Sequence, residues 1–177
     1  MPSVLRRLIV AVTCLALLGA GATLAVATND GGSTGNAAET QYGQVQGCTP
    51  GFWKNHTEDW VGYTPNQTLG SVFAAIGDGT PFSSSALAND TLIEALNYGG
   101  GGGNRGAAKI LLRSAVAALL NASLPGSTYP LTTAQIIAAV NAAINEPATL
   151  STLRADMLAL AAELDGYNNT FTGCHDI

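Results

Sequence analysis

The residues with the most chemical potential lie together in one short segment. Positions 48–56, which read CTPGFWKNH, contain the first tryptophan and the first histidine, and further aromatic residues follow within seven positions. One hypothesis is a binding platform, in which aromatic rings stack on a sugar or another flat ligand while polar neighbours supply hydrogen bonds. The interpretation that we favour is structural: the tryptophans fill the end of a small core, and Asn55 and His56 bond to the backbone of an irregular segment. The candidate binding residues are Trp53, Lys54, Asn55, Trp60 and Tyr63.

A run of glycines is the second feature that suggests chemistry. Gly101, Gly103 and Gly106 match the Gly-x-Gly-x-x-Gly pattern of dinucleotide-binding folds. That pattern requires a preceding strand, whereas the residues before it, Leu96-Asn97-Tyr98, are typical of a helix. We therefore favour a flexible hinge over an anion site at the start of the next helix, for which Asn104 is the expected N-cap.

The N-terminus has the features of an export signal. Arg6 and Arg7 precede an uncharged stretch from residue 8 to 27 that closes with Ala25-Val26-Ala27. Small residues at both ends of that tripeptide are typical of a secretory cleavage site, which predicts a signal peptide over residues 1–27. The alternative is an uncleaved membrane anchor, because about twenty apolar residues also span a bilayer.

Export determines how the cysteines are interpreted. Removal of residues 1–27 takes away Cys14 and leaves Cys48 and Cys174. An even pair in an exported protein predicts a disulfide, which here would join the two ends of the folded unit. Closing a loop of this length stabilises a fold by about 4 to 5 kcal/mol in the chain-entropy model.

The same disulfide would bring the two histidines to one end of the molecule. His175 and Asp176 would then lie near the segment that carries His56, Glu58 and Asp59. Two imidazoles and a carboxylate are able to hold zinc and, with an open position, to activate water. His56, His175 and Asp176 are therefore candidate metal ligands, and an exported metal-assisted hydrolase is one alternative function. No other cofactor is indicated, and no catalytic nucleophile motif is present.

Asparagine sequons predict a possible modification. Five Asn-x-Ser/Thr sequences occur, at Asn55, Asn66, Asn89, Asn121 and Asn168. In a host with the required enzymes these would accept glycans. For Asn55 and Asn121 we favour an accident of composition, so the candidate glycosylation sites are Asn66, Asn89 and Asn168.

Hydrophobic periodicity predicts an all-α fold. Residues 28–47 are small and polar and are expected to form a flexible linker, followed by one domain over 48–177. Apolar spacing predicts helices over 69–76, 91–97 and 107–122, one after Thr132, and one from about 150 that Gly166 caps. Thr91 with Glu94 and Thr132 with Gln135 have capping-box spacing. We expect a compact bundle of four to five helices, closed by the terminal disulfide.

Charge limits the classes of partner. Only 11% of the 177 residues are charged, and the net charge is −5. Nucleic acid is excluded because the chain has no basic surface to neutralise a phosphate backbone. The low charge favours self-association, so a self-assembling filament or matrix subunit is a further alternative. Contact with a membrane is expected only through an uncleaved N-terminal segment.

The chain also resembles a known group. Residues 48–56, the LNYGGG segment at 96–101, the helix 110–121, and the segments YPLTT at 129–133 and LDGYNN at 164–169 carry the likeness. It is similar to a family of exported microbial proteins with a Thr-Pro-Gly-(Phe/Tyr)-Trp-Lys-Asn-His signature and no established activity. The resemblance implies an extracellular setting. We expect a secreted or cell-surface module with a structural or binding role, whose partner is extracellular matrix, a glycan or a surface protein.

Overall fold

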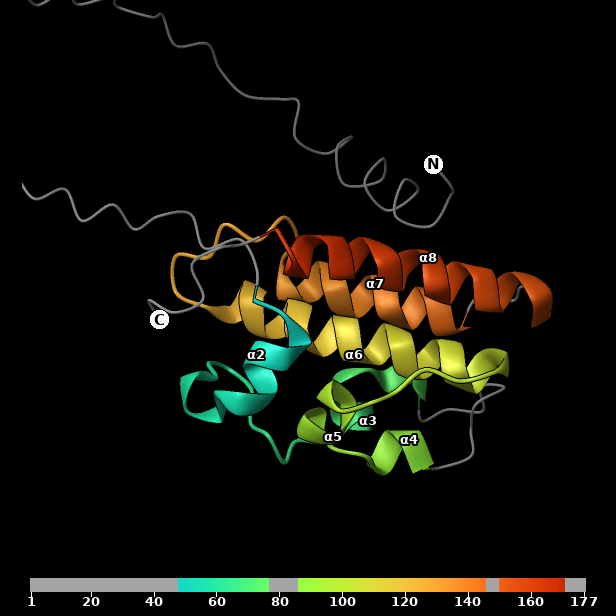
Figure 1. Cartoon of the computed structure of the whole chain (residues 1–177), viewed down its shortest axis with the longest axis horizontal. Helices are drawn as coiled ribbons and strands as arrows, with labels where there is room; N and C mark the ends of the chain where they lie inside the picture. The colour runs from blue at the N-terminus through green and yellow to red at the C-terminus, as the bar shows by residue number, and fades with distance from the viewer. Residues whose placement is uncertain (1–47, 77–85, 146–149, 171–177) are drawn as a thin grey trace, which may run out of the picture.

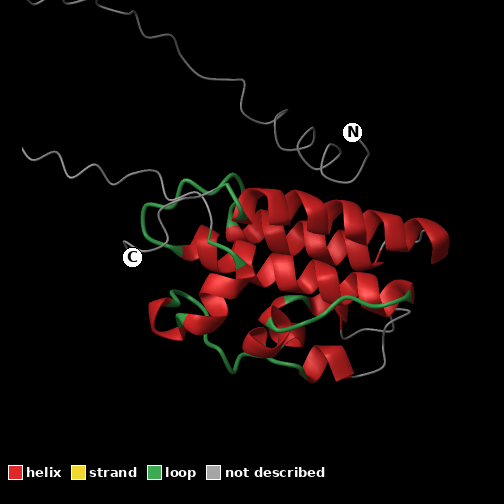
Figure 2. Cartoon of the chain, viewed as in Figure 1, coloured by secondary structure: helices red, strands yellow, loops and turns green. Residues whose placement is uncertain are grey.

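The computed structural model describes residues 48–76, 86–145 and 150–170, and the fold in this part is all-α. The predicted signal peptide, the linker over 28–47, Cys174, His175 and Asp176 lie outside the described residues. Figure 2 shows helices joined by loops, and no strand is assigned among the described elements. The only β-type pairing there is an isolated bridge between Thr68 and Thr91. The predicted all-α class is therefore confirmed.

Three long helices form the body of the molecule: α6 (Gly103–Ser123), α7 (Thr133–Asn145) and α8 (Leu150–Asn168). In Figure 1 α6 lies in the middle, with α7 and α8 on one side and the short helices on the other. The expected bundle of four to five helices is thus a three-helix bundle with a cover of short helices. These are α2 (Pro50–Asn55), η1 (Thr57–Asp59), α3 (Leu69–Val72), η2 (Ala74–Ile76), α4 (Ala86–Asn89) and α5 (Leu92–Leu96).

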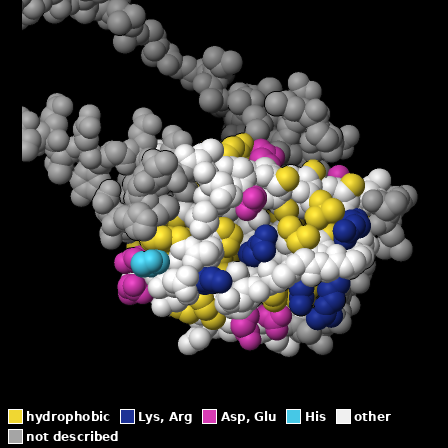
Figure 3. All heavy atoms as spheres, viewed as in Figure 1, with side chains coloured by type: hydrophobic (Ala, Val, Ile, Leu, Met, Phe, Trp, Pro, Cys, Tyr) yellow, Lys and Arg dark blue, Asp and Glu magenta, His cyan; other side chains and the backbone are white. Residues whose placement is uncertain are grey.

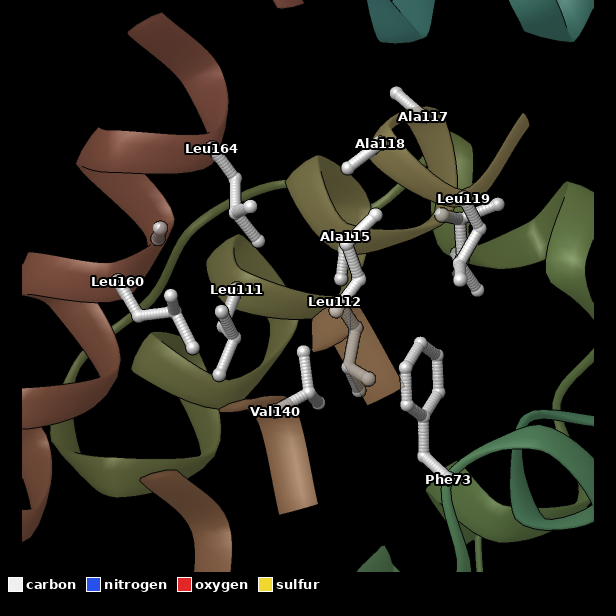
Figure 4. Packing of buried hydrophobic residues seen from close by; sticks show 14 of the residues in the cluster. Phe73, Leu111, Leu112, Ala115, Ala117, Ala118, Leu119, Val140, Leu160 and Leu164 are labelled. Carbon is white, nitrogen blue, oxygen red and sulfur yellow. The ribbon is translucent and has the colours of Figure 1, made fainter. Parts of the chain in front are cut away.

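Helix α6 is buried on nearly every side, as its sequence predicts. Leu111, Leu112 and Ala115 are fully buried. Figure 4 shows Leu160 and Leu164 of α8 beside these residues, and Phe73 approaching from the short helices. Small alanines on α6 allow neighbouring helices to approach closely, and long leucines fill the space between them. A helix of this kind belongs at the centre of a bundle.

Both predicted capping boxes are present. The Thr91 Oγ1 atom accepts the backbone N–H of Glu94, and the Glu94 carboxylate accepts the backbone N–H of Thr91 at 2.7 Å. Gln135 and Thr132 make the equivalent pair of bonds before α7, at 2.9 and 3.3 Å. These bonds satisfy backbone donors that the first turn of a helix leaves without partners.

The helix predicted over residues 69–76 is broken in the structure. It divides into α3 and η2 at Phe73, whose backbone N–H still donates to Leu69 O. Beyond that point the Ala75 N–H donates to Asn141 Oδ1 of α7 at 3.1 Å. A partner on another element thus takes the place of an α-helical one. Leu69, Val72, Phe73 and Ile76 are all buried nonetheless, so the apolar pattern identified core residues correctly.

Two predicted helix ends are also wrong. Gly166 lies inside α8, which continues to Asn168, and its φ is not among the positive values found at Gly62, Gly103 and Gly126. The N-cap of α6 is Gly102, so Asn104 lies inside the helix. Helices α6 and α8 pack against each other, and each continues past the residue that the sequence predicted as its end.

None of the described helices combines the length and the apolarity that a bilayer span requires.

Candidate functional site

Residues 48–56, called the signature segment below, contain the short helix α2. The expectation that this segment is irregular is therefore wrong. Thr49 is the N-cap of α2 and accepts the Phe52 N–H through its side chain, and Pro50 opens the helix. Proline is favoured there because its fixed φ suits a helix start and no N–H is lost from the ladder. The pair Thr49-Pro50 is the sequence signal that could have identified this helix.

Trp53 belongs to the core and not to a ligand surface. Its side chain is fully buried, and its indole N–H donates to Asn121 Oδ1 of α6 at 3.0 Å. Trp60 is half-buried, and its indole N–H donates to the Trp53 carbonyl at 3.0 Å. The interpretation that the tryptophans plug the core is therefore confirmed for Trp53, and a stacking platform that includes it is not available.

The other candidate binding residues differ in exposure. Lys54 and Asn55 are exposed, but the Asn55 amide donates to Gly51 O at 2.9 Å and so serves α2 itself. Tyr63 is half-buried. Burial raises the pKa of the Tyr63 phenol, and a hydrogen bond with the Thr133 side chain opposes that rise.

A buried polar network lies directly behind Trp53. The Asn121 side chain accepts the Cys48 N–H at 2.6 Å, donates to Cys48 O at 2.9 Å, and donates to Asn168 Oδ1 at 3.0 Å. Asn168 in turn accepts the Tyr129 hydroxyl at 2.9 Å and donates to Ser114 O at 2.9 Å. Both asparagine amides use their donors and acceptors, as buried polar groups must if they are not to destabilise the fold.

This network bears on the predicted glycosylation sites. Asn168 is completely buried and its Nδ2 atom, the one that would carry a glycan, is bonded to Ser114 O. The structure therefore argues against a glycan at Asn168 in the folded domain. Asn121 is buried in the same way, which agrees with its interpretation as an accident of composition. Asn66 and Asn89 are exposed, and their modification stays a prediction.

One of the predicted metal ligands lies in a mixed cluster. His56 Nδ1 lies 3.5 Å from Glu58 Oε1 and 3.7 Å from Asp59 Oδ2, and the His56 ring stacks on Phe52 with centroids 4.2 Å apart. The stack follows from α2, which puts residues 52 and 56 on one face. The stack depends on α2, which the sequence pattern did not predict.

At the glycine run, the backbone of Gly101 lies very close to the backbone of Gly106. A Cβ atom on Gly106 would lie 2.0 Å from Gly101 O, so only glycine fits there. The Lys109 ammonium lies 4.9 Å from the centre of the Tyr98 ring, and Arg113 donates to Tyr98 O at 3.3 Å. Arg154 of α8 donates to Gly103 O. Helix α5 and not a strand precedes the run, so a dinucleotide fold is excluded here.

Comparison of the chain with models of protein families, with curated proteins and with solved structures found no match.

Proposed function

We propose that the chain is an exported helical module with a structural or binding role in the extracellular layer. The observation that carries this proposal is the bond between Trp53 and Asn121. Residues 48–56 have the highest density of reactive and aromatic side chains, yet Trp53 in this segment is fully buried in the core. Such an arrangement supports a role as a stable scaffold, because burial of a large aromatic side chain contributes mainly to stability.

The export half of the proposal rests on the N-terminal sequence. Arg6 and Arg7, the uncharged stretch that follows and Ala25-Val26-Ala27 have the order of a secretory signal. The similarity to exported microbial proteins with the same signature supports the same setting. A domain with few charged residues is also suited to a neutral outer surface, where weak repulsion favours assembly with neighbours.

The disulfide between Cys48 and Cys174 is part of the proposal. Cys48 is fully buried, and its backbone is bonded on both sides to the Asn121 amide. That same amide contacts Asn168, which precedes Cys174 by six positions. A span of six residues reaches at most about 20 Å, so the chain after Asn168 is long enough for Cys174 to bond to Cys48.

Export and disulfide formation can be tested together. The full chain is produced in a bacterial host, and the protein outside the cell membrane is analysed by intact mass spectrometry with and without reductant. We expect a chain that begins at Thr28 and gains two hydrogens on reduction. A Cys174→Ser variant should lose that gain. A chain that keeps Met1 and stays inside the cell would contradict the proposal.

The structural or binding role needs its own measurement. Purified chain is sedimented with insoluble extracellular material from the producing organism, and the bound fraction is compared with that of a heat-unfolded sample. We expect the folded chain to co-sediment and to be released by soluble fragments of that material. Equal recovery of folded and unfolded chain, or none of either, would count against the role.

A further inference from the structure

Three titratable side chains cluster at ion-pair distances near the end of α2. The Nδ1 atom of His56 is 3.5 Å from the Glu58 carboxylate and 3.7 Å from the Asp59 carboxylate. A direct N–H···O hydrogen bond needs about 2.7 to 3.2 Å, so both distances are too long for good hydrogen bonds. One atom of each of the three side chains lies within 4.8 Å of the other two.

These distances are close to those between ligands of one metal ion. Zinc binds imidazole nitrogen and carboxylate oxygen at about 2.0 to 2.2 Å in a tetrahedral arrangement, which puts its ligand atoms about 3.3 to 3.6 Å apart. The two measured distances lie at or just above the upper end of that range. Small side-chain rotations at Glu58 and Asp59 would complete the fit, and both residues belong to the single turn η1.

The imidazole is held in position before any ion arrives. The His56 ring stacks on Phe52 with an interplanar angle of 15°. The Asp59 N–H donates to His56 O at 3.3 Å, which closes the η1 turn over the same residue. Fixing the ligand and the turn lowers the entropy lost when a metal ion binds.

We propose that His56 Nδ1 and the Glu58 and Asp59 carboxylates form a surface site for a divalent transition metal ion of the zinc type. One nitrogen and two carboxylate oxygens suit zinc or cobalt, whereas calcium and magnesium prefer oxygen ligands alone. Figure 3 shows a histidine side chain beside acidic side chains at one end of the molecule. The side chains of His56 and Glu58 are 42% and 68% exposed, so the remaining coordination position faces solvent and is open to water or a partner.

Cobalt is the most informative probe because its visible absorption reports coordination geometry. Untagged full-length chain is titrated with Co²⁺ and then with Zn²⁺, and the visible bands of tetrahedral Co²⁺ are followed. We expect one Co²⁺ per chain, with bands that Zn²⁺ abolishes by competition. The absence of saturable binding up to about 1 mM metal would overturn the proposal.

Matched variants assign the site. His56→Gln should weaken Zn²⁺ binding by at least about tenfold, and Asp59→Asn should weaken it as well. Asp156→Asn removes an equal charge from α8, away from the cluster, and should leave the affinity unchanged. Unchanged melting temperatures of the three metal-free variants would show that each is folded. Binding that survives His56→Gln but is lost in His175→Gln would overturn the assignment.

Discussion

Asn121 and Trp53 lie 68 positions apart in the sequence, and the indole N–H of Trp53 donates to the Asn121 side-chain oxygen at 3.0 Å. The same oxygen accepts the Cys48 N–H, so one amide on the central helix fixes both the start of the domain and its signature segment. Because the amide is buried, its loss leaves several polar groups without partners and without water.

Truncation of Asn121 should therefore be costly. Asn121→Ala removes the partner of the Trp53 indole and of the Cys48 backbone, and we expect the free energy of unfolding to fall by at least about 3 kcal/mol. Urea denaturation measures this directly. Asn97→Ala is the control, because Asn97 is exposed and its side chain donates to Ile93 O of the helix that it follows; its effect should be within about 0.5 kcal/mol.

The two buried asparagines should act as one unit. Asn121 and Asn168 share a hydrogen bond of 3.0 Å. Substitution of either residue removes this bond from the other, so the second substitution should cost less than it does in the wild-type chain. A double-mutant cycle of Asn121→Ala and Asn168→Ala should give a coupling energy of about 1 to 2 kcal/mol. Additive effects would mean that the network does not connect α6 to α8 energetically.

Two glycines should respond to alanine in opposite directions. Gly106→Ala places a Cβ atom 2.0 Å from Gly101 O and should destabilise the fold by about 2 kcal/mol or more. Gly166→Ala meets nothing within 4 Å inside α8, so its higher helix propensity should stabilise the fold by about 0.5 to 1 kcal/mol. Thermal melts of both variants test this, and a destabilising Gly166→Ala would favour a helix end at that residue after all.

Local signals in the sequence were reliable where neighbouring residues alone decide the structure. Thr91 with Glu94, and Thr132 with Gln135, predicted helix starts because a capping box needs only four consecutive residues. The partners of Asn121 were not predictable, because they come from segments 47 to 73 positions away. No local pattern in an apolar helix indicates what a buried asparagine binds.

In the candidate site, too, contacts between sequence neighbours were predictable and contacts that depend on the fold were not. The sequence placed His56 near Glu58 and Asp59 simply because they are neighbours, whereas the stack of Phe52 on His56 depends on a helix that was not predicted. The break at Phe73 depends on Asn141 of α7, a long-range partner that no local pattern contains.

Alkaline pH should unfold the domain. Burial raises the pKa values of Tyr98 and Tyr129, and nearby acidic side chains raise them further. The unfolded chain loses its phenol protons near about pH 10, while the folded chain keeps them, so the contribution of these tyrosines to stability is constant below that pH and falls above it. Tyrosinate absorbance and circular dichroism should change together above about pH 10.

A Tyr129→Phe variant separates this effect from general alkaline damage. It loses the bond to Asn168 and should be less stable at neutral pH. It should nevertheless lose less additional stability above about pH 10, because one buried phenol no longer titrates. An equal or steeper loss in the variant would show that Tyr129 does not contribute to the pH dependence.

Hydrogen exchange of the Trp53 indole N–H tests the central claim most directly. In ¹⁵N-labelled protein the two indole signals are assigned with a Trp60→Phe variant, and their exchange in D₂O is followed. The account predicts that the Trp53 proton exchanges only through global unfolding, at the free energy that urea denaturation gives, and that the half-buried Trp60 proton exchanges faster. A Trp53 proton that exchanges as fast as that of Trp60, under conditions where the core amides stay protected, would contradict it.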